Sequence, residues 1–517
     1  MKTNTHSCQQ PSQQQPCASA QQPSQSLPGQ QPCASGHQLC VIGLGYVGLP
    51  LARLFSTKYK TIGFDRNHNR VTEIMSGHDS TMELDESLLK EAIEKNGFLC
   101  TSELEKIKEC NIYIVAVPTP VDENNRPDLT PLIGASRTVG QVISPGDIVI
   151  YESTVYPGVT EEECIPIIEA ESGLTYNKDF YAGYSPERIN PGDKEHTVEK
   201  IKKVTSGSTP QVAEIVDNLY NSVLINGTHK APSIRVAEAS KIIENSQRDV
   251  NIAFMNELAK IFNAMGIDTR DVLEAASSKW NFIKMSPGLV GGHCISVDPY
   301  YLIQKAQVYG VLPRIMTSAR RLNDGMGAYV AEQTIKCMNK KGVLVKDSRI
   351  LILGITFKEN CPDTRNTKVL DIYHTLSEYT RNITIYDPWA NPDSVAREYG
   401  LTITPALPEV ATAGAAAGTA SEVPAAGAGV GSGGEFPAGC AGAGSGGELP
   451  AAGAGVCAVA EVPACAAGAA AGKYDAIILA VAHNQFKDLN YKALLAPNGI
   501  IYDVKGFLPR ELVDARL

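Results

Sequence analysis

The first part of the chain alternates short apolar runs with amphipathic stretches. The apolar runs lie at residues 39–42, 61–64, 112–117, 148–151 and 180–184. Runs this short, separated by helical patterns, are typical of buried strands in a parallel sheet. The pattern therefore predicts an α/β domain in which helices cover both faces of one sheet.

A second alternating region follows after a long helical stretch. No proline or glycine occurs between residues 233 and 265, and a helix of this length would measure roughly 50 Å at about 1.5 Å per residue. Further apolar runs at 349–357, 382–387, 476–481 and 500–503 predict a second doubly wound domain. We therefore expect an α/β protein with two Rossmann-like doubly wound domains. The long central helix would join them and could supply a dimer interface.

Two segments have a biased composition. Residues 1–36 are rich in Gln, Pro and Ser, and such a segment buries too little apolar surface to offset chain entropy, so we expect a disordered tail. Between 406 and 472, a glutamate recurs every thirteen residues in Ala/Gly-rich sequence, from Glu409 to Glu461. Each unit has too few large apolar residues to stack as a solenoid, so we expect an expanded repeat that loops out of the second α/β domain.

The expected organisation is a tail at 1–36, a first Rossmann domain at 37–230 and a central helical region at 231–330. A second Rossmann-like domain follows at 331–517, interrupted by the insert at 406–472.

Charge and cysteine content narrow the class of protein. The net charge of -10 disfavours nucleic acid as a partner, and the absence of an apolar run of about 18 residues predicts no membrane span. The 13 cysteines have no repeated C-x-x-C spacing, which argues against a disulfide framework and against a metal site. Together with the lack of a secretory signal pattern, this favours a reducing cytoplasm.

The first apolar run leads into a glycine-rich turn, Gly43-Leu-Gly-Tyr-Val-Gly48. Its spacing fits the dinucleotide fingerprint, in which a helix start after the turn points its N–H groups at a pyrophosphate. Asp65 ends the next strand. A carboxylate at this position accepts a hydrogen bond from the ribose 2′-hydroxyl and repels a 2′-phosphate. NAD is therefore favoured over NADP. The alternative is an ordinary glycine turn with Asp65 capping a loop.

Two further motifs, Val117-Pro-Thr-Pro120 and Glu152-Ser-Thr154, end strands on the side of the sheet where nucleotides bind. Each alone is more typical of turn chemistry. Beside the glycine turn, both are expected to contact the cofactor.

Residues 286–301 place Cys294 directly after two glycines and a histidine, and Asp298 follows four residues later. The glycines would let backbone approach a ligand closely. Pro287 and Pro299 bracket the segment and predict a rigid loop rather than a helix. A lone cysteine is usually a small buried hydrophobic residue, and the alternative is a nucleophile.

Other candidate groups lie on the long helix and after strands. Lys241 and Asn245 share one helical face and could donate to an oxyanion, although Glu238 and Lys241 could instead form a solvated ion pair. In Tyr184-Ser-Pro-Glu-Arg188, a carboxylate follows a strand and could position a water or merely start a helix. Lys358 and Arg365 follow a strand of the second domain and suit phosphate.

In this order, the motifs resemble those of the nucleotide-sugar 6-dehydrogenases, the family of UDP-glucose and GDP-mannose dehydrogenases. The resemblance covers about residues 38–405 and 473–510. It implies NAD on the first domain and the UDP part of a sugar on the second. It also implies oxidation of a C6 hydroxyl to a carboxylate with two NAD, and a homodimer or higher homo-oligomer.

The resemblance assigns a role to each candidate. Cys294 would capture the aldehyde as a thiohemiacetal and then carry a thioester, which water hydrolyses. Lys241 and Asn245 would stabilise oxyanions, Asp298 would transfer a proton or orient the water, and Glu187 and Thr154 would act in hydrolysis. The expected cofactor contacts are Gly43, Gly45, Tyr46, Val47, Gly48, Asp65, Arg66, Val117, Pro118, Thr119, Thr154 and Arg365. The expected substrate contacts are Glu187, Arg188, Lys241, Asn245, Gly291, His293, Lys358 and Lys505.

Departures from the UDP-glucose enzymes narrow the expected substrate. His293 stands where those enzymes typically have serine, and Val297 precedes Asp298. This form resembles the branch that acts on UDP-N-acetylhexosamines (GlcNAc or GalNAc) in surface-polysaccharide pathways such as capsule synthesis. The sugar epimer stays open, ManNAc included. The alternatives are a UDP-glucose 6-dehydrogenase and, outside enzymes, a nucleotide-binding module whose low-complexity insert recruits partners.

Overall fold

The computed structural model describes residues 36–187, 197–407 and 473–517. Two expected segments lie outside the described residues. They are residues 1–35 of the tail expected at 1–36 and residues 408–472 of the insert expected at 406–472. In the described part of the chain, no helix is long and apolar enough to cross a membrane.

The first α/β domain is built on an eight-stranded sheet. Its strands lie in the order β3-β2-β1-β4-β5-β6-β7-β8. The bounds are β1 (Gln38–Ile42), β2 (Lys60–Phe64), β3 (Leu99–Thr101), β4 (Ile112–Val115), β5 (Ile148–Tyr151), β6 (Tyr181–Tyr184), β7 (Lys203–Gly207) and β8 (Thr228–Lys230). The first six strands in this order are parallel, whereas β7 pairs antiparallel to β6. The order 3-2-1-4-5-6 is that of a dinucleotide-binding Rossmann fold.

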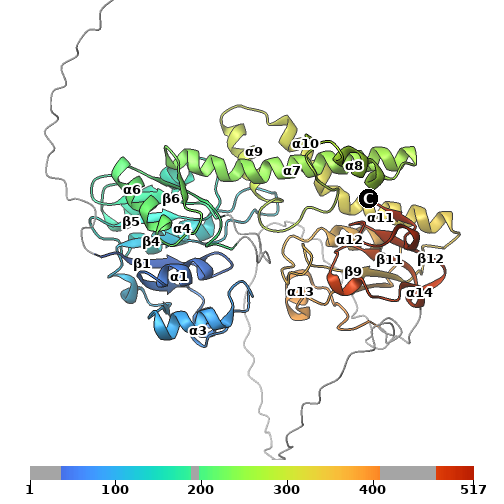
Figure 1. The fold of residues 1–517 in the computed structure, drawn as a ribbon, viewed down its shortest axis with the longest axis horizontal. Helices are drawn as coiled ribbons and strands as arrows, with labels where there is room; N and C mark the ends of the chain where they lie inside the picture. The colour runs from blue at the N-terminus through green and yellow to red at the C-terminus, as the bar shows by residue number, and fades with distance from the viewer. Residues whose placement is uncertain (1–35, 188–196, 408–472) are drawn as a thin grey trace, which may run out of the picture.

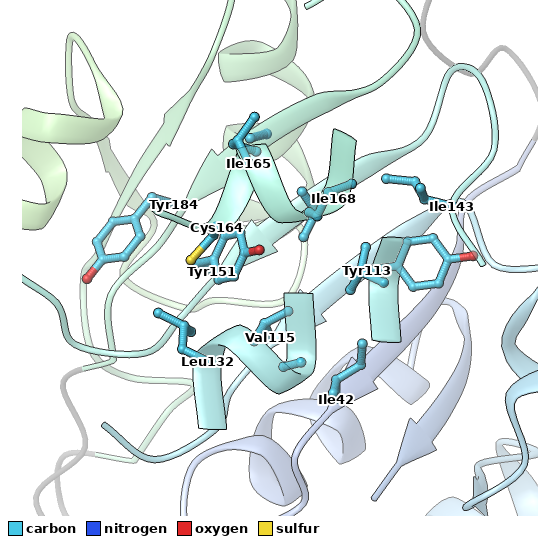
Figure 2. Packing of buried hydrophobic residues seen from close by; sticks show 14 of the residues in the cluster. Ile42, Tyr113, Val115, Leu132, Ile143, Tyr151, Cys164, Ile165, Ile168 and Tyr184 are labelled. Carbon is cyan, nitrogen blue, oxygen red and sulfur yellow. The ribbon is translucent and has the colours of Figure 1, made fainter. Parts of the chain in front are cut away.

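Both faces of this sheet are buried, which explains the continuous apolar runs. Successive residues of a strand point to opposite faces. In β1, Cys40 and Ile42 lie in the hydrophobic cluster on one face, and Leu39 and Val41 lie in the cluster on the other. Figure 2 shows the first cluster, where the strand side chains of β4 and β5 meet Ile168 from the helix above them. The covering helices are α1 (Gly48–Ser56), α2 (His68–Met75), α3 (Glu86–Lys95), α4 (Thr130–Gly140), α5 (Ile165–Ser172, after the π-helical turn η2, Thr160–Cys164) and α6 (Pro210–Asn221).

The long helix α7 (Ile234–Met265) spans both α/β domains, as Figure 1 shows. The Ser233 side chain accepts a hydrogen bond from the backbone N–H of Val236, which caps the first turn, and Gly266 ends the helix in a left-handed conformation. Four more helices complete the central region and lead into the second domain: α8 (Thr269–Ser277), α9 (Asp298–Val308), α10 (Arg314–Asp324) and α11 (Met326–Lys340).

The expected loop at 286–301 is partly wrong, because α9 begins inside it at Asp298. Pro299 lies in the first turn of this helix and does not break it. A helix has no partner for its first N–H groups, so a proline there loses no hydrogen bond.

The second α/β domain has five parallel strands in the order β10-β9-β11-β12-β13. They are β9 (Ile350–Leu353), β10 (Ile383–Tyr386), β11 (Tyr474–Leu479), β12 (Leu495–Asp503) and β13 (Ala515–Arg516), with helices α12 (Val369–Ser377), α13 (Pro392–Tyr399) and α14 (Tyr491–Leu494). The predicted fold class, two parallel-sheet domains joined by a long helix, is confirmed. The short strands β3, β7, β8 and β13 were not predicted.

Replacing residues 408–472 by a short linker is expected to leave turnover within about twofold of wild type. The five strands of the second sheet and the hydrophobic clusters on its two faces consist of residues outside this segment. The measurement is the steady-state rate together with the melting temperature. Loss of the folded protein would mean that the repeat packs into the second domain.

Candidate active site

The glycine turn after β1 has the geometry of a dinucleotide cradle. Gly43 adopts a φ of +91°, and a Cβ at Gly48 would lie 1.8 Å from the Gly43 carbonyl oxygen, so neither position tolerates a side chain. A Cβ on Gly45, by contrast, would meet nothing within 4 Å. The turn is therefore closed on the protein side and open at Gly45, where a pyrophosphate would approach. The residues present fit NAD.

The carboxylate of Asp65 lies at this turn. One of its oxygens accepts a hydrogen bond from the N–H of Leu44 at 2.9 Å, which fixes the acid beside the glycines. Arg66 lines a neighbouring cavity of about 460 Å³ with Phe64 and Arg137. Val47 is the N-cap residue of α1, so the turn passes directly into the helix.

The turn also meets the second domain. The guanidinium of Arg365 lies 4.5 Å from the centre of the Tyr46 ring, and the Asp363 carboxylate holds it at 2.5 and 2.9 Å. Two residues that the sequence predicted as cofactor contacts, 319 positions apart, are thus brought together.

The two other predicted cofactor motifs lie side by side after β4 and β5. The Thr119 hydroxyl donates to the Thr154 carbonyl at 2.8 Å, and the Ser153 hydroxyl donates to the Val117 carbonyl at 2.6 Å. Tyr301 of α9 donates to the carbonyl of Pro120, which follows Pro118 and Thr119, at 2.8 Å. These bonds tie the loop of the first domain to the helix that follows Cys294.

Lys241 and Asn245 on α7 and Asp298 on α9 form one buried group. The Asn245 amide donates to the Asp298 carboxylate at 2.6 Å. Burial raises the pKa of Asp298 to about 6, against the opposing effects of the Lys241 charge and the Asn245 hydrogen bond. The carboxylate is therefore poised to exchange a proton near neutral pH.

The alternative of a solvated ion pair between Glu238 and Lys241 is wrong. Glu238 is fully buried and accepts hydrogen bonds from the backbone N–H groups of Gly158 at 2.6 Å and Thr160 at 3.0 Å. These hydrogen bonds anchor the start of η2. The positive charge of Lys241 instead acts on Asp298 and Cys294, and it acts to lower the pKa of both groups.

Cys294 is reachable by solvent, yet protein atoms surround its thiol closely enough to displace much of its water. This burial raises the pKa of Cys294 to about 11; Lys241 opposes the rise, whereas Asp298 and Glu187 add to it. The Asp298 N–H donates to the Cys294 carbonyl at 2.8 Å, so a single turn sets the spacing of thiol and acid. At neutral pH the thiol is protonated and needs a base.

The two glycines before Cys294 pack closely against the second domain. A Cβ on Gly291 would lie 2.7 Å from the Asn366 carbonyl oxygen, and one on Gly292 would lie 2.8 Å from the Phe357 ring. The second domain fills the space on the Cβ side of both glycines, and the contact between Gly291 and the substrate stays a prediction. The glycines let the loop between β9 and α12 pack closely against the segment before Cys294.

His293 points toward the second domain as well. Its Nε2 lies 3.8 Å from the Asp363 carboxylate. Burial, followed by the nearby Arg365 charge, lowers the pKa of His293 to about 4, and Asp363 only partly offsets this. The imidazole is therefore neutral at physiological pH.

Two lysines of the second domain, Lys505 and Lys358, were predicted to contact the substrate. Lys505 follows β12 and lines a cavity of about 390 Å³ with Arg270, Lys284 and Arg516. These three cationic residues were missed; Lys284, just before the segment that holds Cys294, could have been found from its position. Lys358 lies half-buried in the loop after β9. Arg188 lies outside the described residues.

Glu187 lies in a buried cluster that sequence reasoning also missed. Its carboxylate is 3.6 Å from the Nζ of Lys203 on β7, and the same Nζ lies 2.7 Å from Glu152. No local pattern marks Lys203, since a lysine in a short polar strand is normally solvated.

Comparisons with known proteins agree with this geometry. The sequence models of the UDP-glucose/GDP-mannose dehydrogenase family match at residues 37–224 (NAD binding domain), 235–325 (central domain) and 351–419 (UDP binding domain). A UDP-N-acetyl-D-glucosamine 6-dehydrogenase of Pseudomonas aeruginosa is 50% identical over 483 residues, which are 93% of this chain and 99% of the relative. One from Salmonella typhi is 49% identical over 483 residues, 93% of this chain and 98% of its own.

Among solved structures, a UDP-D-ManNAc dehydrogenase from Pyrococcus horikoshii superimposes with a TM-score of 0.74 at 26% identity, covering 93% of this chain and 98% of that one. A non-catalytic binding module is not supported, because the chain matches enzymes over nearly its whole length and groups its thiol, lysine, amide and acid in one site. The chain belongs to the UDP-glucose/GDP-mannose dehydrogenase family and is an NAD-dependent nucleotide-sugar dehydrogenase.

Proposed function

We propose that the chain oxidises the C6 hydroxyl of a UDP-N-acetylhexosamine to a carboxylate, with Cys294 as the covalent nucleophile. The observation that carries this proposal is the meeting of Cys294, Lys241, Asn245 and Asp298 next to the loops that follow β4 and β5. The two relatives at 50% and 49% identity favour UDP-GlcNAc as the substrate.

NAD, when bound at the Gly43–Gly48 turn, supplies the hydride acceptor for each of the two oxidations. We assign the cradle to Gly43, Gly45, Tyr46, Val47 and Gly48, the ribose to Asp65 and Arg66, and the remaining contacts to Val117, Pro118, Thr119, Thr154 and Arg365. Asp65 suits this role because it is fixed at the turn.

The protein side chains manage protons and the developing negative charge. The Cys294 thiol adds to the C6 aldehyde, and Asp298 accepts the proton that the thiol loses. Lys241 and Asn245 stabilise the oxyanion that forms on the former carbonyl oxygen. The second oxidation leaves a thioester, which water hydrolyses with help from Glu187 and Thr154.

We assign the uridine diphosphate to the second domain. The cavity beside Lys505 collects four cationic side chains and adjoins residues 284–287, a few residues before Cys294. We also assign Lys358, His293 and Arg188 to the substrate. Lys358 follows Phe357, which packs against Gly292, and His293 lies beside Asp363 of the second domain. A matched pair of Lys505→Met and Lys340→Met tests this, because only the first should raise the KM for the UDP-sugar.

Activity is expected to fall as the pH is lowered through about 6. Asp298 accepts a proton only as a carboxylate, and burial raises its pKa to about 6. Below that pH the group is already protonated, so kcat/KM should decrease about tenfold per pH unit. A pH profile between 5 and 9 checks this. A flat profile across pH 5–7 would contradict the role of Asp298 as the base.

A homodimer is part of the proposal. Large apolar side chains on α7 remain exposed: Val236, Ile243, Phe254 and Ile261. Monomers seldom leave so many in one helix without a partner surface. A sedimentation measurement that gives the mass of a single chain at micromolar concentration would contradict it.

We also propose a cytoplasmic location and a role in surface-polysaccharide synthesis. In the described part of the chain every cysteine is free, as expected in a reducing compartment. Deleting the gene should remove an N-acetylhexosaminuronic acid from the cell-surface polysaccharide. An unchanged sugar composition would exclude this role.

The substrate is tested by NADH formation with UDP-GlcNAc, UDP-GalNAc, UDP-ManNAc and UDP-glucose. We expect the highest kcat/KM with UDP-GlcNAc. A preference for UDP-glucose would instead identify the enzyme as a UDP-glucose 6-dehydrogenase. The proposed chemistry of Cys294 would stay the same.

A further inference from the structure

A lysine is buried between two carboxylates in the first α/β domain. Lys203 on β7 has no exposed side-chain surface, and its Nζ donates to Glu152 at 2.7 Å. The same Nζ donates to the Pro186 carbonyl at 3.2 Å and lies 3.6 Å from the Glu187 carboxylate. Burying an ammonium group costs free energy unless it is paired with an anion. The two carboxylates therefore favour a cationic side chain at this position.

The groups around this lysine come from the ends of two strands and from one helix. Glu152 follows β5, Glu187 follows β6, and Tyr220 of α6 donates its hydroxyl to Glu152 at 2.5 Å. The Nζ of Lys203 also lies 5.4 Å from the centre of the Tyr220 ring. With one cation for two carboxylates, removing Lys203 would force the two acids to share a proton.

Glu187 connects this cluster to the reacting sulfur. The proposed function gives its carboxylate a part in hydrolysis of the Cys294 thioester, and this carboxylate lies 3.6 Å from the Nζ of Lys203. Lys203 also holds the loop that carries Glu187 through the Pro186 carbonyl, one residue earlier. The Lys203 ammonium group therefore contacts both the backbone next to Glu187 and the Glu187 carboxylate.

We propose that Lys203 is a positioning residue for hydrolysis of the thioester, because its ammonium group pairs with the Glu187 carboxylate and holds the loop that carries it. The inference rests on the proposed function, because it needs a thioester on Cys294. In this step the water oxygen bonds to the thioester carbon and Glu187 takes one water proton. The carbon–sulfur bond breaks, and its electron pair leaves with the Cys294 thiolate. No oxidation or reduction occurs.

Lys203→Met tests the proposal in the full-length enzyme with NAD and UDP-GlcNAc. We expect a first-turnover burst of two NADH per active site at a rate near that of wild type. Steady-state turnover at pH 7 should fall at least about tenfold, because Glu187 and Glu152 now share a proton. An acyl adduct on Cys294 should accumulate in acid-quenched samples read by mass spectrometry, and raising the pH should restore turnover.

Glu152→Gln is the matched variant, because it removes the competing carboxylate and leaves Lys203 to Glu187. The pH midpoint of steady-state turnover should shift up in Lys203→Met and down, or not at all, in Glu152→Gln. If Lys203→Met does not fold, the double variant Lys203→Met/Glu152→Gln replaces it. The double variant has neither the cation nor the second carboxylate, so burial alone should still raise its midpoint, by less than in Lys203→Met.

The two possible failures are distinguishable. A wild-type enzyme that releases one NADH per sugar would overturn the proposed function, whatever Lys203 does. If wild type yields two NADH, the role of Lys203 is overturned by a Lys203→Met enzyme that slows the burst and the steady state equally, with no adduct and an unchanged pH midpoint. In the double variant, an unchanged midpoint would overturn it too.

Discussion

Cys294→Ala is expected to abolish uronate formation while leaving NAD affinity within about twofold. Alanine cannot form the thiohemiacetal, and loss of a nucleophile typically lowers turnover by a factor on the order of 10³ or more. NAD affinity should persist because Cys294 is not among the residues assigned to the cofactor, which centre on the Gly43–Gly48 turn and Asp65. Product formation by mass spectrometry and NAD binding by calorimetry are the two measurements.

Cys337→Ala is the matched control, since this free cysteine lies on α11 and is only half-buried. It should retain wild-type turnover. Uronate formation by Cys294→Ala at more than a tenth of the wild-type rate would exclude covalent catalysis by this residue. Equal losses in both variants would indicate a general effect of removing a thiol.

Asp298→Asn is expected to lower kcat at pH 7 by about 10²–10⁴-fold, the usual range for loss of a general base. Asparagine has the same shape and can still accept the hydrogen bond from Asn245. It cannot take the proton of a thiol whose pKa is raised to about 11. Stopped-flow detection of the second NADH, which forms only after the thiol has added to the aldehyde, measures the effect before product release.

The stability of Asp298→Asn should not fall at pH 7, which separates catalysis from folding. Burial raises the folded-state pKa of Asp298 to about 6, above its ordinary value of 3.8. A raised pKa stabilises the fold only while the acid is protonated, and that contribution is lost as the pH rises through about 6. At pH 7 the neutral asparagine should therefore melt at the same or a higher temperature. Asp393→Asn, on the exposed side of α13, should change neither rate nor melting temperature.

The fold could be predicted where the sequence pattern has one physical cause. Strands buried on both faces must be apolar at every position, and this marked β1, β4, β5 and β9. The edge strand β8 is Thr-His-Lys and is mostly exposed, so no apolar pattern marks it. Its pairing with β7 depends on contacts with distant residues.

The site could be predicted where residues act within one turn or loop, and less well where the partner is distant in sequence. Cys294 and Asp298 lie on one turn, and their association was predicted from spacing. Glu238 binds backbone N–H groups about 80 positions away, so spacing on its own helix suggested the wrong partner. Lys203 was missed for the same reason, because its carboxylates come from two other strands.

The most direct test of covalent four-electron oxidation is the ratio of NADH formed to UDP-GlcNAc consumed by the wild-type enzyme. The Cys294 mechanism predicts a ratio of two, with no free aldehyde trapped by an added hydroxylamine. A ratio of one, with the aldehyde released, would contradict it.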